Sequence, residues 1–176
     1  MLEHAARDIL LVDGYNMIGA WPELREIAER DLEEARDRLI ELLADYQGFT
    51  GQKVIVVFDA HQVPGPRSRT KQYRLDIVYT KEKETADECI ERLVDELADR
   101  KRRIQVATSD YVEQRVIFAK GALRLSAREL MNQVKESRKQ MRKVMEEQRE
   151  PARNTFDHRI GSELKEVFER WRRGYK

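Results

Sequence analysis

Short apolar runs alternate with segments of helical spacing along most of the chain. Five mainly apolar runs are typical of strands buried on both faces: 9–12, 54–58, 75–79, 104–108 and the shorter 123–125. Apolar positions recur at helical spacing in three segments: 31–46, 85–98 and 126–150. Strands separated by helices predict an α/β fold, in which helices cover both faces of a mostly parallel central sheet.

Helix start signals and chain breakers give the expected boundaries. Three pairs fit capping boxes at helix starts: Asp31 with Glu34, Thr85 with Glu88 and Ser126 with Glu129. The segment 61–74 combines prolines with several basic residues, which predicts a basic, mobile loop. Pro151 is expected to end the long helix before a last helix over 163–173. We therefore expect one domain over 1–150 and a C-terminal helical extension over 151–176 that packs on it.

Charge is abundant but sorted along the chain. The 176 residues include 34 Lys and Arg and 33 Asp and Glu, for a formal net charge of +1. Residues 1–99 hold 13 basic and 22 acidic groups, a net −9, whereas residues 100–176 hold 21 and 11, a net +10. The total excludes a uniformly basic protein that coats nucleic acid, and the asymmetry between the halves points to a site or a partner.

Other features of the sequence bear on the cellular compartment and on cofactors. Cys89 is the single cysteine, so an intramolecular disulfide is excluded and a reducing compartment is expected. The apolar runs are far shorter than a membrane span and the N-terminus lacks a secretion signal, so we expect a cytoplasmic protein without a membrane partner. The glycine motifs of dinucleotide-binding and P-loop proteins are absent, so no nucleotide cofactor is expected.

Carboxylates follow several of the predicted strands. Asp13 and Asp59 end two strands, Asp110 lies just past a third, and Asp87 lies in the first turn of a helix. Because parallel strands end at one edge of a sheet, these groups are expected to meet there. Clustered carboxylates repel unless a cation neutralises them, and oxygen ligands suit one or two Mg²⁺ or Mn²⁺ ions. Asn16, one turn after Asp13, is expected to orient a carboxylate or a metal-bound water.

Each of these residues also has a purely structural interpretation. Asp110 could cap a helix together with Glu113, Asp13 before Gly14 could be a turn residue, and Asp87 could complement a helix dipole. A phosphatase or a phospho-accepting receiver domain also places aspartates at strand ends. Receiver domains, however, carry an acidic pair after the first strand, whereas Val12 precedes Asp13 here.

Four ordered sequence blocks carry a family resemblance: ILLVDGYNMIGAW over 9–21, VIVVFDAH over 54–61, TKEKETADE over 80–88 and VATSDY over 106–111. Together with 121–130 and 168–174, they resemble the YacP-type NYN domain, a family of PIN-like nucleases. The resemblance implies a PIN-like three-layer sandwich, with the NYN nuclease domain over 1–150 and a helical C-terminal part.

The resemblance also implies an activity. It points to a metal-dependent endoribonuclease close to the ribosome-associated enzyme of Firmicutes that cuts mRNA in the ribosomal A site. RNA and the ribosome would be its partners. Asp13, Asp87 and Asp110 match the family's acidic metal site, and Asn16 and Asp59 are close by, so these five are the candidate catalytic residues.

An acidic pocket repels RNA, so basic residues are needed around it to bind phosphates. The candidates for RNA binding are Arg67, Arg69, Lys71, Tyr73, Arg74, Arg124 and Arg128. Tyr73 is expected to stack on a base. The basic run 135–143 is interleaved with glutamates and is better explained as a solvated helix face. An alternative function is a non-catalytic module that binds RNA or the ribosome through the same surface.

Overall fold

The computed structural model describes residues 8–62, 69–72, 74–98, 102–110, 115 and 117–149. It divides into two units, Met1–Arg138 and Lys139–Lys176. Of the second unit, the described residues 139–149 continue a helix that starts in the first. The expected boundary at residue 150, the extension over 151–176 and its last helix all lie outside the described residues.

The centre of the first unit is a six-stranded sheet of order β3-β4-β2-β1-β5-β6. Its strands are β1 (Ile9–Asp13), β2 (Lys53–Phe58), β3 (Arg69–Gln72), β4 (Leu75–Tyr79), β5 (Ile104–Ala107) and β6 (Leu123–Leu125). All pairs are parallel except β3 with β4, which is antiparallel. The mostly parallel sheet is therefore confirmed, and the five parallel strands end at one edge.

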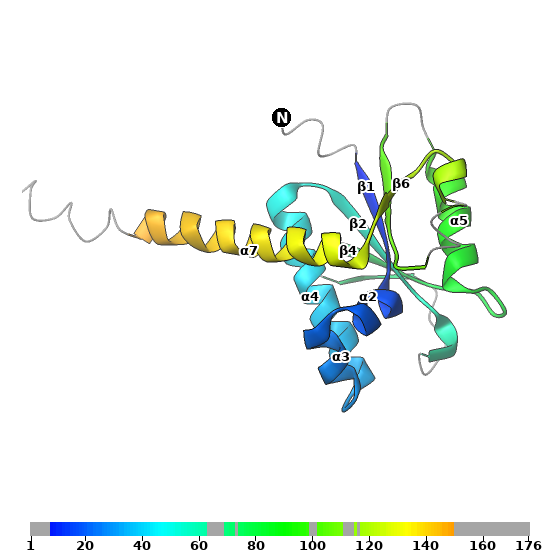
Figure 1. The fold of residues 1–176 in the computed structure, drawn as a ribbon, viewed down its shortest axis with the longest axis horizontal. Coiled ribbons are helices and arrows are strands. Elements are labelled where there is room, and N and C mark those ends of the chain that lie inside the picture. The colour runs from blue at the N-terminus through cyan, green and yellow to red at the C-terminus, as the bar shows by residue number, and fades with distance from the viewer. Residues whose placement is uncertain are drawn as a thin grey trace, which may run out of the picture. The chain divides into compact units, whose positions relative to one another are not determined.

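Helices cover both faces of this sheet (Figure 1). Three helices, α2 (Gly14–Ala20), α3 (Pro22–Ala28) and α4 (Leu32–Thr50), lie on one side, and α5 (Ala86–Leu97) lies on the other. A 3₁₀ turn, η1 (Ala60–Gln62), follows β2, and α7 (Ala127–Arg149) follows β6. The α/β three-layer sandwich is thus confirmed for the described part of the chain.

The core is split between the two faces because successive strand residues point to opposite sides. In β1, Leu10 and Val12 pack toward α2, α3 and α4, whereas Ile9 and Leu11 pack toward α5. All four side chains are buried. Leu130 and Val134 at the start of α7 join the first of these clusters. Burial on both faces explains why the strand sequences lack polar alternation.

The predicted helix starts are found as hydrogen-bonded caps. Asp31 accepts from the amides of Glu33 and Glu34, and both Thr85 with Glu88 and Ser126 with Glu129 form reciprocal capping boxes. Helix α4 ends at Gly51, whose φ of 73° is left-handed and whose amide donates to the Gln47 carbonyl.

Two sequence expectations are corrected. Residues 69–72 of the expected loop form the edge strand β3, which pairs with β4 from Arg69 opposite Val78 to Gln72 opposite Leu75. After β1 the chain enters α2 and then α3. Both are seven-residue helices that the sequence pattern did not indicate. The helix that Asp110 and Glu113 could cap falls partly outside the described residues, and 115 and 117–119 are helical.

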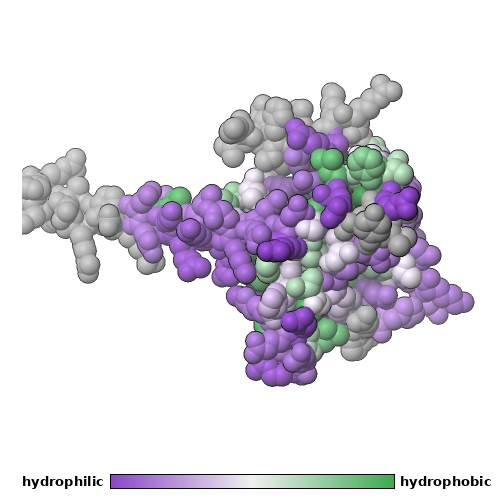
Figure 2. Space-filling model, viewed as in Figure 1, coloured by the Kyte–Doolittle hydropathy of each residue, from purple (hydrophilic) through white to green (hydrophobic). Residues whose placement is uncertain are grey.

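Hydrophilic side chains cover much of the visible surface in Figure 2. None of the helices in the described ranges is long and apolar enough to cross a membrane.

Candidate functional site

Asp13 lies at the centre of the candidate site. It is the last residue of β1 and also the N-cap of α2, so its position is fixed by a strand and a helix together. Its side chain is only 8% exposed, and Oδ1 accepts a hydrogen bond from the Asn16 amide at 3.2 Å. A carboxylate with so little water access and one backbone donor is poorly compensated.

The electrostatics of Asp13 show which other groups are near. Its pKa is raised from 3.8 to about 6, first by burial and then by the negative charges of Asp87, Asp110 and Asp59, while the Asn16 amide opposes the shift. Asp59 follows β2 and Asp110 follows β5, so both come from strands that flank β1. Asp87 comes from the second position of α5. The structure thus brings the four sequence-predicted aspartates to one edge of the sheet.

The other three aspartates are more accessible than Asp13. Asp59 and Asp87 are half-buried and Asp110 is exposed. Asp59 Oδ1 accepts from the His61 amide at 2.9 Å, and the Asp110 amide donates to Thr108 Oγ1 at 3.1 Å. Within the described ranges, no three or more His, Cys, Asp or Glu side chains are arranged so that they could hold a metal ion. The charges of Asp59, Asp87 and Asp110 all act on Asp13, and carboxylate oxygens suit a hard divalent cation.

Asn16 connects this cluster to the end of β5. Its Oδ1 accepts two hydrogen bonds from Ser109, one from the amide at 2.8 Å and one from Oγ at 2.6 Å. The contact joins residues 93 positions apart, directly before Asp110. Asn16 therefore positions the chain that carries Asp110, and its amide nitrogen is the remaining donor group of the side chain.

Ser109 is a site residue that the sequence pattern did not single out. Its role depends on a contact with Asn16 that only the folded chain creates. The one available signal was its place between a buried strand and Asp110.

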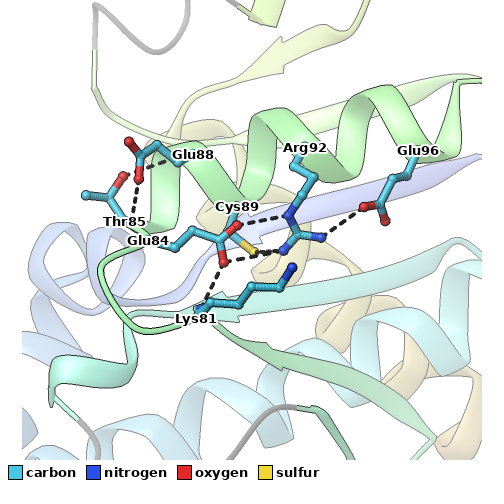
Figure 3. A network of polar contacts seen from close by, with 7 residues as sticks. All are labelled: Lys81, Glu84, Thr85, Glu88, Cys89, Arg92 and Glu96. Atoms are coloured by element: carbon cyan, nitrogen blue, oxygen red, sulfur yellow. Dashed lines mark hydrogen bonds and ion pairs between the residues drawn. The ribbon is translucent and has the colours of Figure 1, made fainter.

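The turn before Asp87 is held by a polar network (Figure 3). Glu84 accepts from Arg92 Nε at 2.9 Å and Nη2 at 3.4 Å, and from the Lys81 amide at 2.9 Å. Arg92 also donates to Glu96 at 3.0 Å and to Cys89 Sγ at 3.4 Å. The hydrogen bonds from Arg92 keep the pKa of Glu84 below its usual value. These contacts fasten the β4–α5 turn to α5, the helix whose second residue is Asp87.

Close packing under the site explains Gly14. A Cβ on Gly14 would lie 2.3 Å from Phe58 Cε1, so only glycine lets the start of α2 approach the end of β2. Tyr15 packs edge-on against Phe58, with ring centroids 5.2 Å apart, and its hydroxyl accepts from Arg36 at 3.0 Å. Gly14 therefore serves the close packing of the start of α2 on β2.

The first group of candidate RNA-binding residues is only partly described. Arg67 and Tyr73 lie outside the described residues, and Arg69 and Lys71 belong to β3, whose backbone alone is described. Arg74 is exposed and has a left-handed φ of 65°.

The second group of basic candidates lies beside the carboxylate cluster. Arg124 on β6 and Arg128 on α7 are both exposed and line one pocket of about 480 Å³. Ser109 lines the same pocket. The structure therefore places both arginines close to the chain that carries Asp110.

Comparisons with known proteins match both the sequence and the fold of this chain. A family model described as the YacP-like NYN domain matches residues 10–173. The chain is 49% identical over 171 residues to a Bacillus subtilis (strain 168) protein named "Uncharacterized protein YacP", covering 95% of this chain and 98% of that one. The structure is similar to the crystal structure of Rae1 (YacP) from Bacillus subtilis, with a TM-score of 0.73 and 49% identity over 95% of each chain. A tryptophan-to-leucine mutant of Rae1 matches with a TM-score of 0.69 and 51% identity over 77% of this chain and 79% of that one.

Proposed function

Because the chain belongs to the YacP-like NYN domain family, which suggests a nuclease, we propose that it is a metal-dependent endoribonuclease that hydrolyses RNA phosphodiester bonds. The observation that carries the proposal is that Asp13 is buried within reach of the charges of three other aspartates, Asp59, Asp87 and Asp110, and that its pKa is raised to about 6. Burying a carboxylate near three others costs folding free energy unless a cation neutralises them, and this cost supports a role in cation binding.

The residues divide by role in this proposal. Asp13, Asp87 and Asp110 would hold one or two Mg²⁺ or Mn²⁺ ions, and Asp59 would add to the negative charge that attracts them. When bound, such an ion supplies charge stabilisation at the phosphate and a more acidic water for in-line attack. Asn16 would orient a ligand or the attacking water through its amide nitrogen, since Ser109 occupies its oxygen. Arg124 and Arg128 would bind phosphates of the RNA.

The substrate and setting extend the same proposal. We infer mRNA as the substrate, the ribosome as the partner and the cytoplasm as the compartment, following the family resemblance of the sequence. The second basic surface in this proposal is the edge of the sheet, where β3 carries Arg69 and Lys71 and is followed by Arg74. Together with Arg67 and Tyr73, this segment would contact RNA or the ribosomal surface.

The decisive experiment replaces two carboxylates by amides of nearly equal size. Asp13→Asn combined with Asp87→Asn is expected to leave the fold intact and to abolish cleavage of a labelled single-stranded RNA in buffer with Mg²⁺ or Mn²⁺. Asp37→Asn combined with Asp45→Asn removes the same charge from exposed positions on α4 and is expected to cut like the wild type. Unchanged cutting by the first double variant would overturn the proposal. Mapping RNA 5′ ends in translating and translation-blocked lysates then tests the link to translation.

One observation favours a second candidate function, a non-catalytic module that binds RNA or the ribosome. In the part of the chain that the structure describes, the acidic side chains do not form a ready three-ligand cage. A binding module would retain RNA and leave it uncut at saturating Mn²⁺, and both double variants would then bind RNA alike.

A further inference from the structure

A pocket of about 480 Å³ opens beside the carboxylate cluster, between the end of α2 and the start of α7. This volume lies within the range of small-molecule sites, about 300–1,000 Å³. Its walls come from Trp21 and Pro22 on one side and from Arg124, Arg128 and Met131 on the other.

A long-range hydrogen bond joins two residues that line the pocket. The Trp21 indole Nε1 donates to the Ala127 carbonyl at 2.8 Å, which joins the α2–α3 junction to the first residue of α7. Trp21 is 4% exposed and packs in the core, so the small part of it that borders the pocket is held in one place. Met131 adds a half-buried, polarizable side chain to the other wall. A preformed apolar wall of this kind suits a flat aromatic ring.

The two arginines give the pocket its charge. Both are exposed, and among the described residues neither guanidinium forms a salt bridge. Arg124 lies near Glu129, whose pKa is lowered by its hydrogen bonds to Ser126 and by the charge of Arg124. Guanidinium groups bind phosphate oxygens through paired N–H donors, so an anion with an apolar ring matches this lining.

The pocket also adjoins the candidate site through a single residue. Ser109 lines it, donates to Asn16 Oδ1 through its amide and its hydroxyl, and directly precedes Asp110. Because Ser109 lines the pocket and directly precedes Asp110, an RNA strand bound at the aspartates would pass close to the pocket.

We propose that this pocket is the subsite for one nucleotide of a single-stranded RNA substrate, with Arg124 and Arg128 binding its phosphate and the wall of Trp21 and Met131 receiving its base. The proposal rests on the nuclease function proposed above and adds how the substrate is held. Single-stranded RNA fits because its bases are free to leave the stack and enter a pocket, whereas those of a duplex are not.

Two variants separate the charge of the pocket from its shape. In EDTA, where no cleavage occurs, binding of a fluorescein-labelled RNA hexanucleotide is measured as a function of salt. Arg124→Ala combined with Arg128→Ala is expected to raise Kd by about tenfold or more and to lower the salt slope by about one for each phosphate that the variant no longer binds. Ala20→Trp, at the exposed end of α2, fills the pocket and is expected to raise Kd by about tenfold with an unchanged salt slope.

A matched control removes equal charge elsewhere. Arg25→Ala combined with Arg30→Ala alters exposed residues in and after α3 that do not line the pocket, and is expected to bind like the wild type. Wild-type binding by the Arg124/Arg128 variant would overturn the phosphate assignment. Wild-type binding by Ala20→Trp would overturn the base assignment. Circular dichroism of each variant verifies that the fold is retained.

The two proposals fail in different ways. If the Asp13/Asp87 variant cuts RNA normally while the pocket variants bind RNA weakly, the catalytic assignment is wrong and the nucleotide subsite stands. If that variant no longer cleaves RNA and the pocket variants bind normally, the subsite is wrong and the nuclease stands.

Discussion

At the scale of single residues, the role proposed for Asp13 conflicts with stability. Burial and three neighbouring aspartates raise its pKa from 3.8 to about 6, so its ionised form is less stable in the folded chain than in the unfolded one. A raised carboxyl pKa favours the fold below about pH 4, and this contribution is lost as pH rises through 6. The shift corresponds to about 3 kcal/mol.

Asp13→Asn should therefore stabilise the metal-free protein at neutral pH. Asparagine keeps a good N-cap oxygen for the Asn16 amide but carries no charge. The gain in unfolding free energy is expected to be near zero at about pH 4 and to approach about 3 kcal/mol above pH 6. Urea denaturation in EDTA at several pH values measures it. The exposed Asp37→Asn is the control, and a gain that does not grow with pH would contradict this explanation.

At the scale of elements, the β4–α5 turn shows how a salt bridge can matter for position more than for stability. Arg92 is partly exposed, so its ion pairs with Glu84 and Glu96 add little to the stability of the fold. The same contacts restrict the turn that precedes Asp87, while the Thr85 capping box fixes the first turn of α5. We therefore expect Arg92 to act as a positioning residue for Asp87.

Arg92→Ala is expected to weaken cleavage several-fold through the metal rather than through the RNA. Freeing Glu84 lets the turn move, so the Mn²⁺ concentration that gives half-maximal activity should rise while KM for RNA stays the same. Arg38→Ala is the matched control, since it removes ion pairs with Glu23 and Glu41 away from the site. An equal change in both variants would assign Arg92 a merely structural role.

The elements also show what a sequence can predict. The parallel strands and the three capped helices were predictable, because apolar runs and capping pairs are local signals. The edge strand β3 was not, because a basic segment after two prolines resembles a loop and its pairing with β4 is a tertiary contact. Helices α2 and α3 were too short to show periodicity.

In the candidate site too, residues with a local sequence signal were predictable and residues defined by tertiary contacts were not. The aspartates could be selected because strand ends in a parallel sheet share an edge. Ser109 and the packing reason for Gly14 could not, since each depends on a partner far along the chain, Asn16 and Phe58 respectively.

At the scale of the whole molecule, the fold mixes charges that the sequence separates. The acidic first half supplies Asp13, Asp59 and Asp87, and the basic second half supplies Asp110 together with Arg124 and Arg128. The hydrogen bonds from Ser109 to Asn16 join the two halves at the cluster. A net charge of +1 therefore conceals an acidic centre beside basic groups, an arrangement that fits the proposed nuclease.

Metal binding should appear as stability of the whole fold. If the aspartates bind Mn²⁺ only when folded, metal at about one hundred times its Kd adds about 2.7 kcal/mol to the unfolding free energy. The melting temperature of the wild type is expected to rise with Mn²⁺ and to return with EDTA. The Asp13→Asn/Asp87→Asn variant should show no rise, whereas the Asp37→Asn/Asp45→Asn control should follow the wild type. Equal responses of all three proteins would place the ion elsewhere.

The hydrogen bond between Trp21 and Ala127 has a practical consequence. Trp21 borders the pocket and its indole N–H is hydrogen-bonded to a second lining residue, so its fluorescence is expected to change when the pocket's contents change. The protein has two tryptophans, and the second, Trp171, lies outside the described residues. Replacing Trp171 with phenylalanine leaves Trp21 as a built-in optical reporter, so that occupancy of the pocket can be followed in real time without a label.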